Sequence, residues 1–178
     1  MYQQIIKFWF EETKKSQWFK KDEDFDRLIN FRFSDIHNRA IKGELFSWRE
    51  TSLGMLAEII VLDQFSRNMY REKPESFAYD SLALILAQSA IAGGHDLQLS
   101  LEQRRFLHMP FMHSESLIIH QQAIELYTKL GIEDALNFER RHKIIIDKFS
   151  RYPHRNKILG RTSTAEEMDF LTLSGSRF

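Results

Sequence analysis

The sequence predicts an all-α protein, with seven to eight helices packed as antiparallel helical hairpins. Two observations predict this class. The chain of 178 residues contains only 7 Gly and 3 Pro, so few residues interrupt a helix. Its apolar residues recur mostly at helical spacing, and no segment gives a convincing strand pattern. At this length we expect one domain over residues 1–178, with a core rich in aromatic rings because the chain has 15 Phe and 3 Trp.

Three helices are expected in the first part of the chain. Residues 25–36 place most of their apolar side chains on one helical face, and Gly43 is the predicted stop. Residues 53–62 are apolar nearly all round, as in a buried central helix. A buried strand is the alternative there, because Ile-Ile-Val favours strands, but the ten-residue length favours a helix. Residues 77–92 form another apolar segment, which ends at the glycine pair 93–94.

The next helix is short. Ser100 and Gln103 fit a capping box that opens it. Pro110 is expected to end this helix or to start a turn, because proline removes a backbone donor and crowds the preceding helical turn.

Three more helical segments complete the chain. Residues 114–130 form an amphipathic helix that Gly131 stops. A helix from residue 132 or 133 to about residue 149 follows, and Pro153 closes it. Residues 163–167 contain two overlapping capping boxes for a last short helix.

The composition argues against several classes of protein. There is no Cys, which excludes disulfide scaffolds and Cys-ligated metal sites. The 25 Lys and Arg balance 25 Asp and Glu, which argues against a nucleic-acid partner. No apolar run approaches the length of a membrane span, because Glu58, Asp63 and Gln88 interrupt the longest ones. The first residues lack the pattern of a signal peptide, so we expect a cytoplasmic protein without a membrane partner.

Three polar segments interrupt the apolar helices, and the first extends the most apolar of them. On a helix, Asp63 lies four residues before Arg67, which lies four residues before Arg71. Gln64 and Asn68 have the same spacing. A buried charge must be paired, so these residues can form an internal brace. Alternatively, the two guanidinium groups hold an anion.

The second polar segment is a turn that carries His113, Ser114 and Glu115 next to a predicted helix start. Exposed backbone N–H groups at a helix start favour an anion. The alternative is local: Ser114 caps the helix, Glu115 complements its dipole and His113 hydrogen-bonds nearby. A Ser–His–acid triad has less support, because adjacent residues on one turn rarely form one and no Gly-x-Ser-x-Gly elbow is present.

The third polar segment covers residues 148–161, which contain five Lys or Arg besides one histidine. Its candidate donors are Arg151, His154, Arg155, Asn156 and Arg161. These side chains can present several N–H groups to one ligand. The alternative is a basic surface loop balanced by nearby acidic residues.

Neither a metal nor a cofactor is expected. The seven histidines include no His-Glu-x-x-His motif and no pair four residues apart. A ferritin-like site needs two Glu-x-x-His motifs, and the chain has one, from Glu139 to His142. Neither a Walker A motif nor Gly-x-Gly-x-x-Gly is present.

Several long strings stand in a characteristic order between residues 6–10 and Phe170. They are Trp18-Phe19, Gly43–Leu45 with Trp48, Leu62–Arg71, Phe77–Asp80, Met109-Pro110 with His113–Glu115, Phe149–Asn156 and Ile158–Arg161. In these strings the chain resembles the uncharacterised bacterial family called domain of unknown function 924, which is placed with the tetratricopeptide-like helical folds. The resemblance implies an all-helical, tetratricopeptide-like bundle or short superhelix. It implies no activity.

Four positions depart from the pattern of that family. Ser66 stands where Pro is usual, and Ser150 stands where Gly is usual. Met112 and Ser116 stand where acidic residues are usual. The loss of two carboxylates weakens an acid–base or metal role for the turn between them.

The leading hypothesis for function is a non-enzymatic binding module. The three polar segments would line one Arg- and His-rich pocket, which favours a carboxylate or phosphate group on a small molecule or a peptide. The first alternative is an enzyme, with His113 or His154 as general acid–base and Glu115 or Asp63 orienting it. In that enzyme Arg67 and Arg155 would hold the charge of the substrate. The second is a protein-interaction scaffold in which the polar segments are purely structural.

Overall fold

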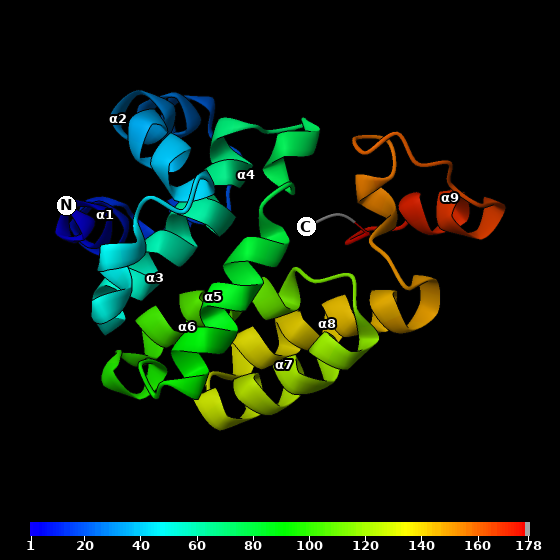
Figure 1. Cartoon of the computed structure of the whole chain (residues 1–178). Helices are drawn as coiled ribbons and strands as arrows, with labels where there is room; N and C mark the ends of the chain where they lie inside the picture. The colour runs from blue at the N-terminus through cyan, green and yellow to red at the C-terminus, as the bar shows by residue number, and fades with distance from the viewer. Residues whose placement is uncertain (177–178) are drawn as a thin grey trace. The chain divides into compact units, whose positions relative to one another are not determined.

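The computed structural model describes residues 1–176, and all regular secondary structure in that range is helical (Figure 1). The all-α class is therefore confirmed. By their contacts the residues form two compact units. Unit 1 comprises Met1–Arg71 and Glu75–Pro110, and unit 2 comprises Glu72–Pro74 and the chain from Phe111 onward. The single domain stays a prediction, as does the tetratricopeptide-like arrangement.

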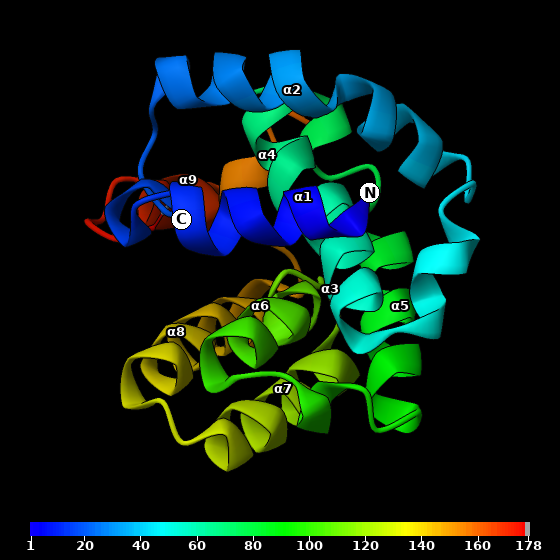
Figure 2. The ribbon, with the colours of Figure 1, turned by 90° about the vertical axis from the view of Figure 1, so that its left-hand side faces the viewer.

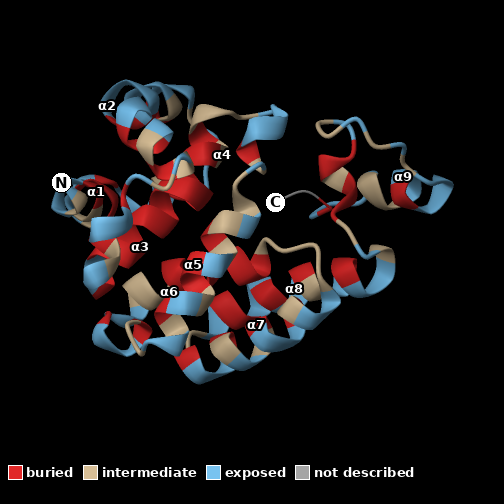
Figure 3. Cartoon of the chain, viewed as in Figure 1, coloured by how far each residue is buried: buried red, intermediate tan, exposed pale blue. Residues whose placement is uncertain are grey.

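Unit 1 is built around a buried helix. Its helices are α1 (Tyr2–Lys7), α2 (Glu23–Ile41), α3 (Ser52–Ile60), α4 (Ser66–Met69), α5 (Asp80–Ala92) and most of α6 (Leu101–Met112). Helix α3 packs against both α1 and α5, and nearly all of its residues are buried (Figure 3). The predicted central helix is confirmed, and the alternative of a strand is excluded. Glu58 is the one charged residue of this helix. Its carboxylate accepts two hydrogen bonds from Arg49, at 2.7 and 2.8 Å.

The helical backbone of α3 continues beyond Ile60. The backbone continues through a π-helical turn, Val61–Phe65, directly into α4, and the junction residues keep right-handed helical angles. A π turn is wider than an α turn and is frequent at functional sites. The π-helical turn carries Asp63 and Gln64, and α4 carries Arg67 and Asn68. Most of the first polar segment therefore lies on one continuous helical segment.

Aromatic rings fill the core of unit 1, as the composition predicts. Trp9 is fully buried and meets the rings of Phe25, Phe65 and Phe106, with centroids 5.6 to 6.2 Å apart. The indole N–H of Trp18 donates to the carbonyl oxygen of Trp9 at 2.9 Å. These edge and tilted contacts join segments that are distant in sequence.

Local signals fixed most helix ends in unit 1. Helix α2, the long helix that packs on α4 (Figure 2), begins after Asp22, whose carboxylate accepts two backbone N–H groups. It ends just before Gly43, which has a φ of +71°. Helix α5 ends at the predicted glycine pair but begins at Asp80, three residues later than the apolar pattern indicates.

Helix α6 confirms one prediction and corrects another. The capping box forms, since Ser100 Oγ accepts from the Gln103 amide at 3.3 Å and Gln103 Oε1 accepts from the Ser100 amide at 3.0 Å. The expected stop at Pro110 is wrong, because Pro110 lies inside the helix. The proline removes one backbone hydrogen bond of the helix, and burial of the side chains of Phe111 and Met112 offsets this cost.

Unit 2 contains a helical hairpin and a short C-terminal helix. Helices α7 (Leu117–Leu130) and α8 (Glu133–Phe149) pack together, and their two-residue connection begins at Gly131 with a φ of +74°. Helix α9 (Ala165–Leu171) follows the second of the two overlapping capping boxes. The side chain of Tyr152 is fully buried between the hairpin and α9 segments, against Ile145 and Ile146.

One predicted boundary in unit 2 is wrong and another is confirmed. Helix α7 begins at Leu117 rather than at residue 114, because side chains hold residues 113–115 in a turn described below. Helix α8 covers Glu133–Phe149, as predicted, but its stop is Ser150, which has a left-handed φ of +56°, rather than Pro153. Pro153 instead opens a 3₁₀ turn. Among the described residues, no helix combines the length and hydropathy that a bilayer crossing requires.

Candidate functional site

The predicted site residues fall into both units. The first polar segment, which contributes Asp63, Gln64, Arg67, Asn68 and Arg71, lies in unit 1. The other two segments, which contribute His113, Ser114, Glu115, Arg151, His154, Arg155, Asn156 and Arg161, lie in unit 2. The structure brings these two segments together within unit 2. A single pocket formed by all three segments stays a prediction.

Asp63 is buried at the π turn, with 1% of its side chain exposed. Its Oδ2 accepts from Gln64 Nε2 at 2.5 Å, and its Oδ1 lies 3.1 Å from Arg67 Nη1. The same Nη1 group donates to the Asp63 carbonyl oxygen at 2.8 Å. Asp63 and Arg67, which the sequence places four residues apart on one helix, therefore form an ion pair.

The two arginines of this segment each hold a further carboxylate. Arg67 donates to both oxygens of Asp80, at 2.9 and 3.0 Å. Arg71 donates to both oxygens of Asp26, at 2.5 and 2.7 Å, and Asn68 donates to Asp26 at 2.8 Å. With Asp63, two guanidinium groups thus meet three carboxylates. These carboxylates occupy donors with which the two arginines would bind an external anion.

A histidine beside this segment is not a proton carrier near neutral pH. Ser66 donates its hydroxyl to the Leu62 carbonyl oxygen at 2.6 Å, so its oxygen accepts from His37 Nε2 at 2.8 Å. Burial lowers the pKa of His37 to about 4. His37 therefore stays neutral and anchors α2 to α4.

In unit 2, the second and third segments meet where α6 ends. The last carbonyl groups of a helix have no partner within the helix. Here Tyr152 donates its hydroxyl to the carbonyl oxygen of Met112 at 2.5 Å. Arg155 donates from Nη2 to the carbonyl oxygen of His113 at 3.0 Å, and its guanidinium lies over the ring of Tyr152. The third segment thus caps the end of α6 from outside the helix.

The next carbonyl group in the turn is also bound by a side chain. Ser114 accepts from His120 Nε2 at 2.8 Å. The other ring nitrogen of His120 lies 2.7 Å from Glu139 Oε1, and both side chains are fully buried. Three successive carbonyl groups, at residues 112–114, are therefore held by three different side chains.

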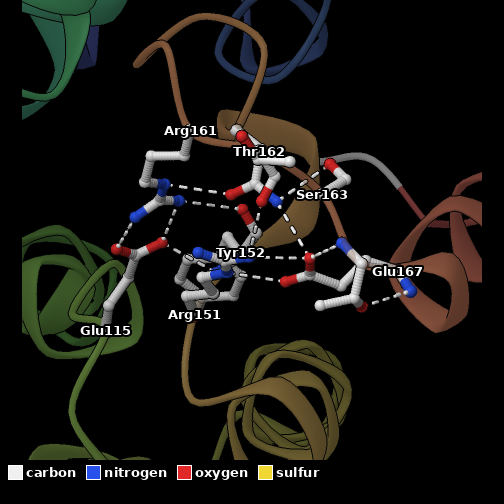
Figure 4. Close-up of polar contacts among 9 residues, drawn as sticks. Glu115, Arg151, Tyr152, Arg161, Thr162, Ser163 and Glu167 are labelled. Carbon is white, nitrogen blue, oxygen red and sulfur yellow. Dashed lines mark hydrogen bonds and ion pairs between the residues drawn. The ribbon is translucent and has the colours of Figure 1, made fainter.

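Glu115 completes the turn by binding with its carboxylate (Figure 4). Arg161 donates to both of its oxygens, at 2.6 and 2.9 Å, and the Tyr152 amide donates to Oε1 at 2.7 Å. Burial raises the pKa of Glu115, but the hydrogen bonds from Arg161 and Tyr152, with the charges of Arg155 and Arg161, lower it more. Glu115 is therefore an ionised anchor.

A second carboxylate, on α9, binds the other end of the same loop (Figure 4). Arg151 donates to both oxygens of Glu167, at 2.6 and 2.8 Å. The Thr164 amide and the Asn156 side chain add bonds at 2.8 and 3.3 Å. The hydrogen bond from Arg151 is the main cause that lowers the pKa of Glu167 to about 2. Asn156 accepts from Arg161 at 2.9 Å and so joins the two clusters.

Three of the four histidines of unit 2 lie around one tyrosine. The rings of His120, His142 and His154 lie 5.6 to 6.2 Å from the ring of Tyr152. Burial lowers the pKa of His142 to about 3, and its Nδ1 donates to the Phe138 carbonyl oxygen at 2.8 Å. Across residues 1–176, no three acidic or histidine side chains are grouped as a metal ion would require.

The sequence patterns did not identify most of the residues that bind the predicted site residues. They are Asp26, His37, Asp80, His120, Glu139, Tyr152 and Glu167. Four of these stood in noted patterns: Asp80 and Tyr152 in specific strings, Glu139 in the lone Glu-x-x-His motif, and Glu167 in a capping box. Spacing alone could not show that they pair with residues up to 45 positions away.

The comparisons with known proteins extend over nearly the whole chain. The profile of a family described as bacterial proteins of unknown function, DUF924, matches residues 5–175. A solved structure of a protein of unknown function, ATU0120 from Agrobacterium tumefaciens, is similar, with 38% sequence identity and a TM-score of 0.91. The match covers 96% of each chain. No curated protein matches.

Proposed function

This chain belongs to the DUF924 family of bacterial proteins of unknown function, and from that premise we propose that it is a non-enzymatic helical binding module whose polar segments brace its helix ends. One observation carries the proposal. Each of Arg67, Arg71, Arg151 and Arg161 already holds a carboxylate of the chain itself through two hydrogen bonds. Such forked pairs occupy the donors with which an arginine would bind a ligand carboxylate or phosphate.

Displacing one of these internal carboxylates is costly. An external anion at Arg161 would leave Glu115, whose side chain is 25% exposed, without its partner. Losing one member of a fully buried pair costs about 3 to 5 kcal/mol, and an exposed pair contributes about 0 to 1 kcal/mol. A partly exposed pair lies between these limits, so a ligand must supply more than the guanidinium contact to compete.

The arrangement of the histidines supports a non-enzymatic role. An acid–base enzyme needs a histidine that reaches both a substrate and a proton acceptor. His120 and Glu139 form a histidine–carboxylate pair in unit 2, and neither side chain reaches solvent. His37 and His142 are neutral near pH 7 because burial lowers the pKa of each.

An anionic partner remains the second candidate, and one observation favours it. Residues 148–161 contain five Lys or Arg and no Asp or Glu. Two of the braced guanidinium side chains there, Arg151 and Arg161, keep 29% and 25% of their surface exposed. A peptide carboxylate or a phosphate could approach this basic loop without entering the braces.

A thermal-shift experiment separates the two candidates. The probes are inorganic phosphate, citrate and an oligoglutamate peptide, tested on the wild type, Arg161→Ala and Lys157→Ala. Lys157 is exposed and is the control for the loss of one loop charge. If the segments are braces, no probe raises the Tm, and only Arg161→Ala lowers it.

The opposite result would support the anionic partner. A probe at about 100 times its Kd adds about 2.7 kcal/mol of stability, which raises the Tm by about 5 to 10 °C for a chain of this size. Such a rise in the wild type would support an anion bound at the loop. If Arg161→Ala alone abolished the rise, while both variants stay folded, the anion would bind the donors of Arg161, and the brace proposal would be overturned.

A further inference from the structure

The protons around His120 can be counted from its two contacts. A neutral imidazole has one N–H, whereas the imidazolium has two. Nε2 faces the Ser114 carbonyl oxygen at 2.8 Å, and a carbonyl only accepts, so Nε2 carries a proton. Nδ1 faces Glu139 Oε1 at 2.7 Å, a distance that also requires a proton between the two atoms. The pair thus holds two protons and is neutral overall.

Two arrangements of the second proton satisfy this count. Either Nδ1 keeps it, which gives an imidazolium and a carboxylate, or Glu139 keeps it and donates it to Nδ1. The other carboxyl oxygen, Oε2, decides between them. It is buried and, among the described residues, it has no hydrogen-bond partner. An ionised oxygen without a partner in a dry site is far more costly than the carbonyl oxygen of a neutral acid.

The surroundings of Glu139 agree with the neutral acid. Helix α7 presents His120 to it, α8 presents His142 and Lys143, and the loop after α8 presents Tyr152 near the His120 ring. His142 is neutral, and Lys143 donates to both oxygens of Asp147 at 2.6 Å. Burial raises the pKa of Glu139, although the contacts with His120 and the charge of Lys143 act in the opposite direction.

We propose that Glu139 is a neutral carboxylic acid at neutral pH and acts as a proton-dependent lock on the turn at residues 112–116. Its O–H donates to Nδ1 of a neutral His120, which fixes the proton of that ring on Nε2. Nε2 then donates to Ser114 and, at 3.1 Å, to the oxygen of Tyr152, whose hydroxyl holds Met112. One proton on α8 thus sets the direction of every hydrogen bond that reaches the turn through His120.

Loss of the Glu139 proton removes a hydrogen bond that holds the turn. With Glu139 ionised and His120 neutral, the single ring proton can serve either the carboxylate or Ser114, but not both. The proton moves to Nδ1 beside the buried negative charge, and the Ser114 carbonyl group then faces a lone pair on Nε2. The sign follows from the raised pKa: the stabilisation is complete below about pH 4.5, the ordinary glutamate value, and is lost as pH rises through the folded value.

The test compares the wild type with Glu139→Gln and with Glu125→Gln, an exposed control on α7. A glutamine amide can donate to Nδ1 as the acid does, and it does not titrate. We expect Glu139→Gln to melt within about 3 °C of the wild type at pH 7. Hydrogen exchange of amides 113–116, corrected for intrinsic rates, should accelerate with rising pH in the wild type and in Glu125→Gln. In Glu139→Gln it should not.

An infrared measurement tests the protonation state directly. With ¹³C-labelled glutamate, the wild type at pH 7 should show the carbonyl stretch of a protonated carboxyl group, and Glu139→Gln should lack it. Absence of this band in the folded wild type would overturn the proposal. So would a large Tm loss for Glu139→Gln at pH 7, because that result is expected if removing a carboxylate leaves a buried imidazolium unpaired.

Discussion

Arg161 and Glu115, 46 residues apart in sequence, form a forked ion pair with bonds of 2.6 and 2.9 Å. The pair ties the loop after α8 to the turn before α7, and the Tyr152 amide strengthens it with a third bond to the same carboxylate. Because Glu115 is thereby held ionised and in place, the polar strings of unit 2 act as one brace.

The first prediction concerns the brace itself. Arg161→Ala should lower the free energy of unfolding by about 2 kcal/mol, between the values for exposed and buried pairs. Glu115→Gln should cost less, because the amide oxygen still accepts one bond. A double-mutant cycle measured by urea denaturation should give a coupling of at least 0.5 kcal/mol between the two sites. Strict additivity would show that the pair contributes nothing.

The second prediction concerns the forked pair of unit 1. Arg71→Lys should destabilise the chain by about 1 kcal/mol, because an ammonium group cannot donate to both oxygens of Asp26 in the planar geometry of a guanidinium. The matched control is Arg27→Lys on the exposed face of α2, where the pair with Asp24 is solvent-exposed. If both substitutions change the urea midpoint equally, the geometry of the Asp26 pair has no special role.

The third prediction concerns acid. His37, His108 and His142 have pKa values of about 4, 4 and 3 in the folded chain, against an ordinary 6.5, and burial is the main cause. Between pH 6.5 and 4 the unfolded chain therefore binds more protons, so stability falls as pH falls. Each histidine contributes a slope of up to about 1.4 kcal/mol per pH unit.

A glutamine substitution isolates one of these contributions. His37→Gln can still donate to Ser66 but does not titrate. In urea denaturation at pH 7, 6 and 5, the loss of stability on acidification should be smaller in His37→Gln than in the wild type. An identical pH dependence in both proteins would contradict a neutral buried His37.

The fourth prediction concerns the end of α8. Ser150 has a φ of +56°, a left-handed conformation that costs an L-residue roughly 1 kcal/mol and costs glycine nothing. Ser150→Gly should therefore raise the Tm, by about 2 to 4 °C per kcal/mol gained. Ser34→Gly, in the exposed interior of α2, should lower it, because glycine is a poor helix former. A fall in Tm with Ser150→Gly would show that the serine side chain stabilises this helix end.

Local patterns were enough to predict most of the helices. The apolar run of residues 53–62 identified the buried central helix, since its length fits a helix better than a strand. Gly43, Gly131 and the capping box of Ser100 marked helix ends through interactions within a few residues. The prediction that Pro110 ends its helix was wrong. The effect of a proline on a helix depends on how strongly the following residues are buried, which is a tertiary property.

The sequence also determined which residues carry the polar chemistry, because charged and amide side chains inside apolar helices must find partners. Only the tertiary structure decided who those partners are. Asp26 and Glu167 lie 45 and 16 residues from the arginines that bind them, and nothing in the local spacing encodes these distances. Periodicity reports interactions within a helical turn, whereas the folded chain places distant carboxylates beside each guanidinium and a neutral acid beside His120. Those contacts support the proposal that the polar segments are braces.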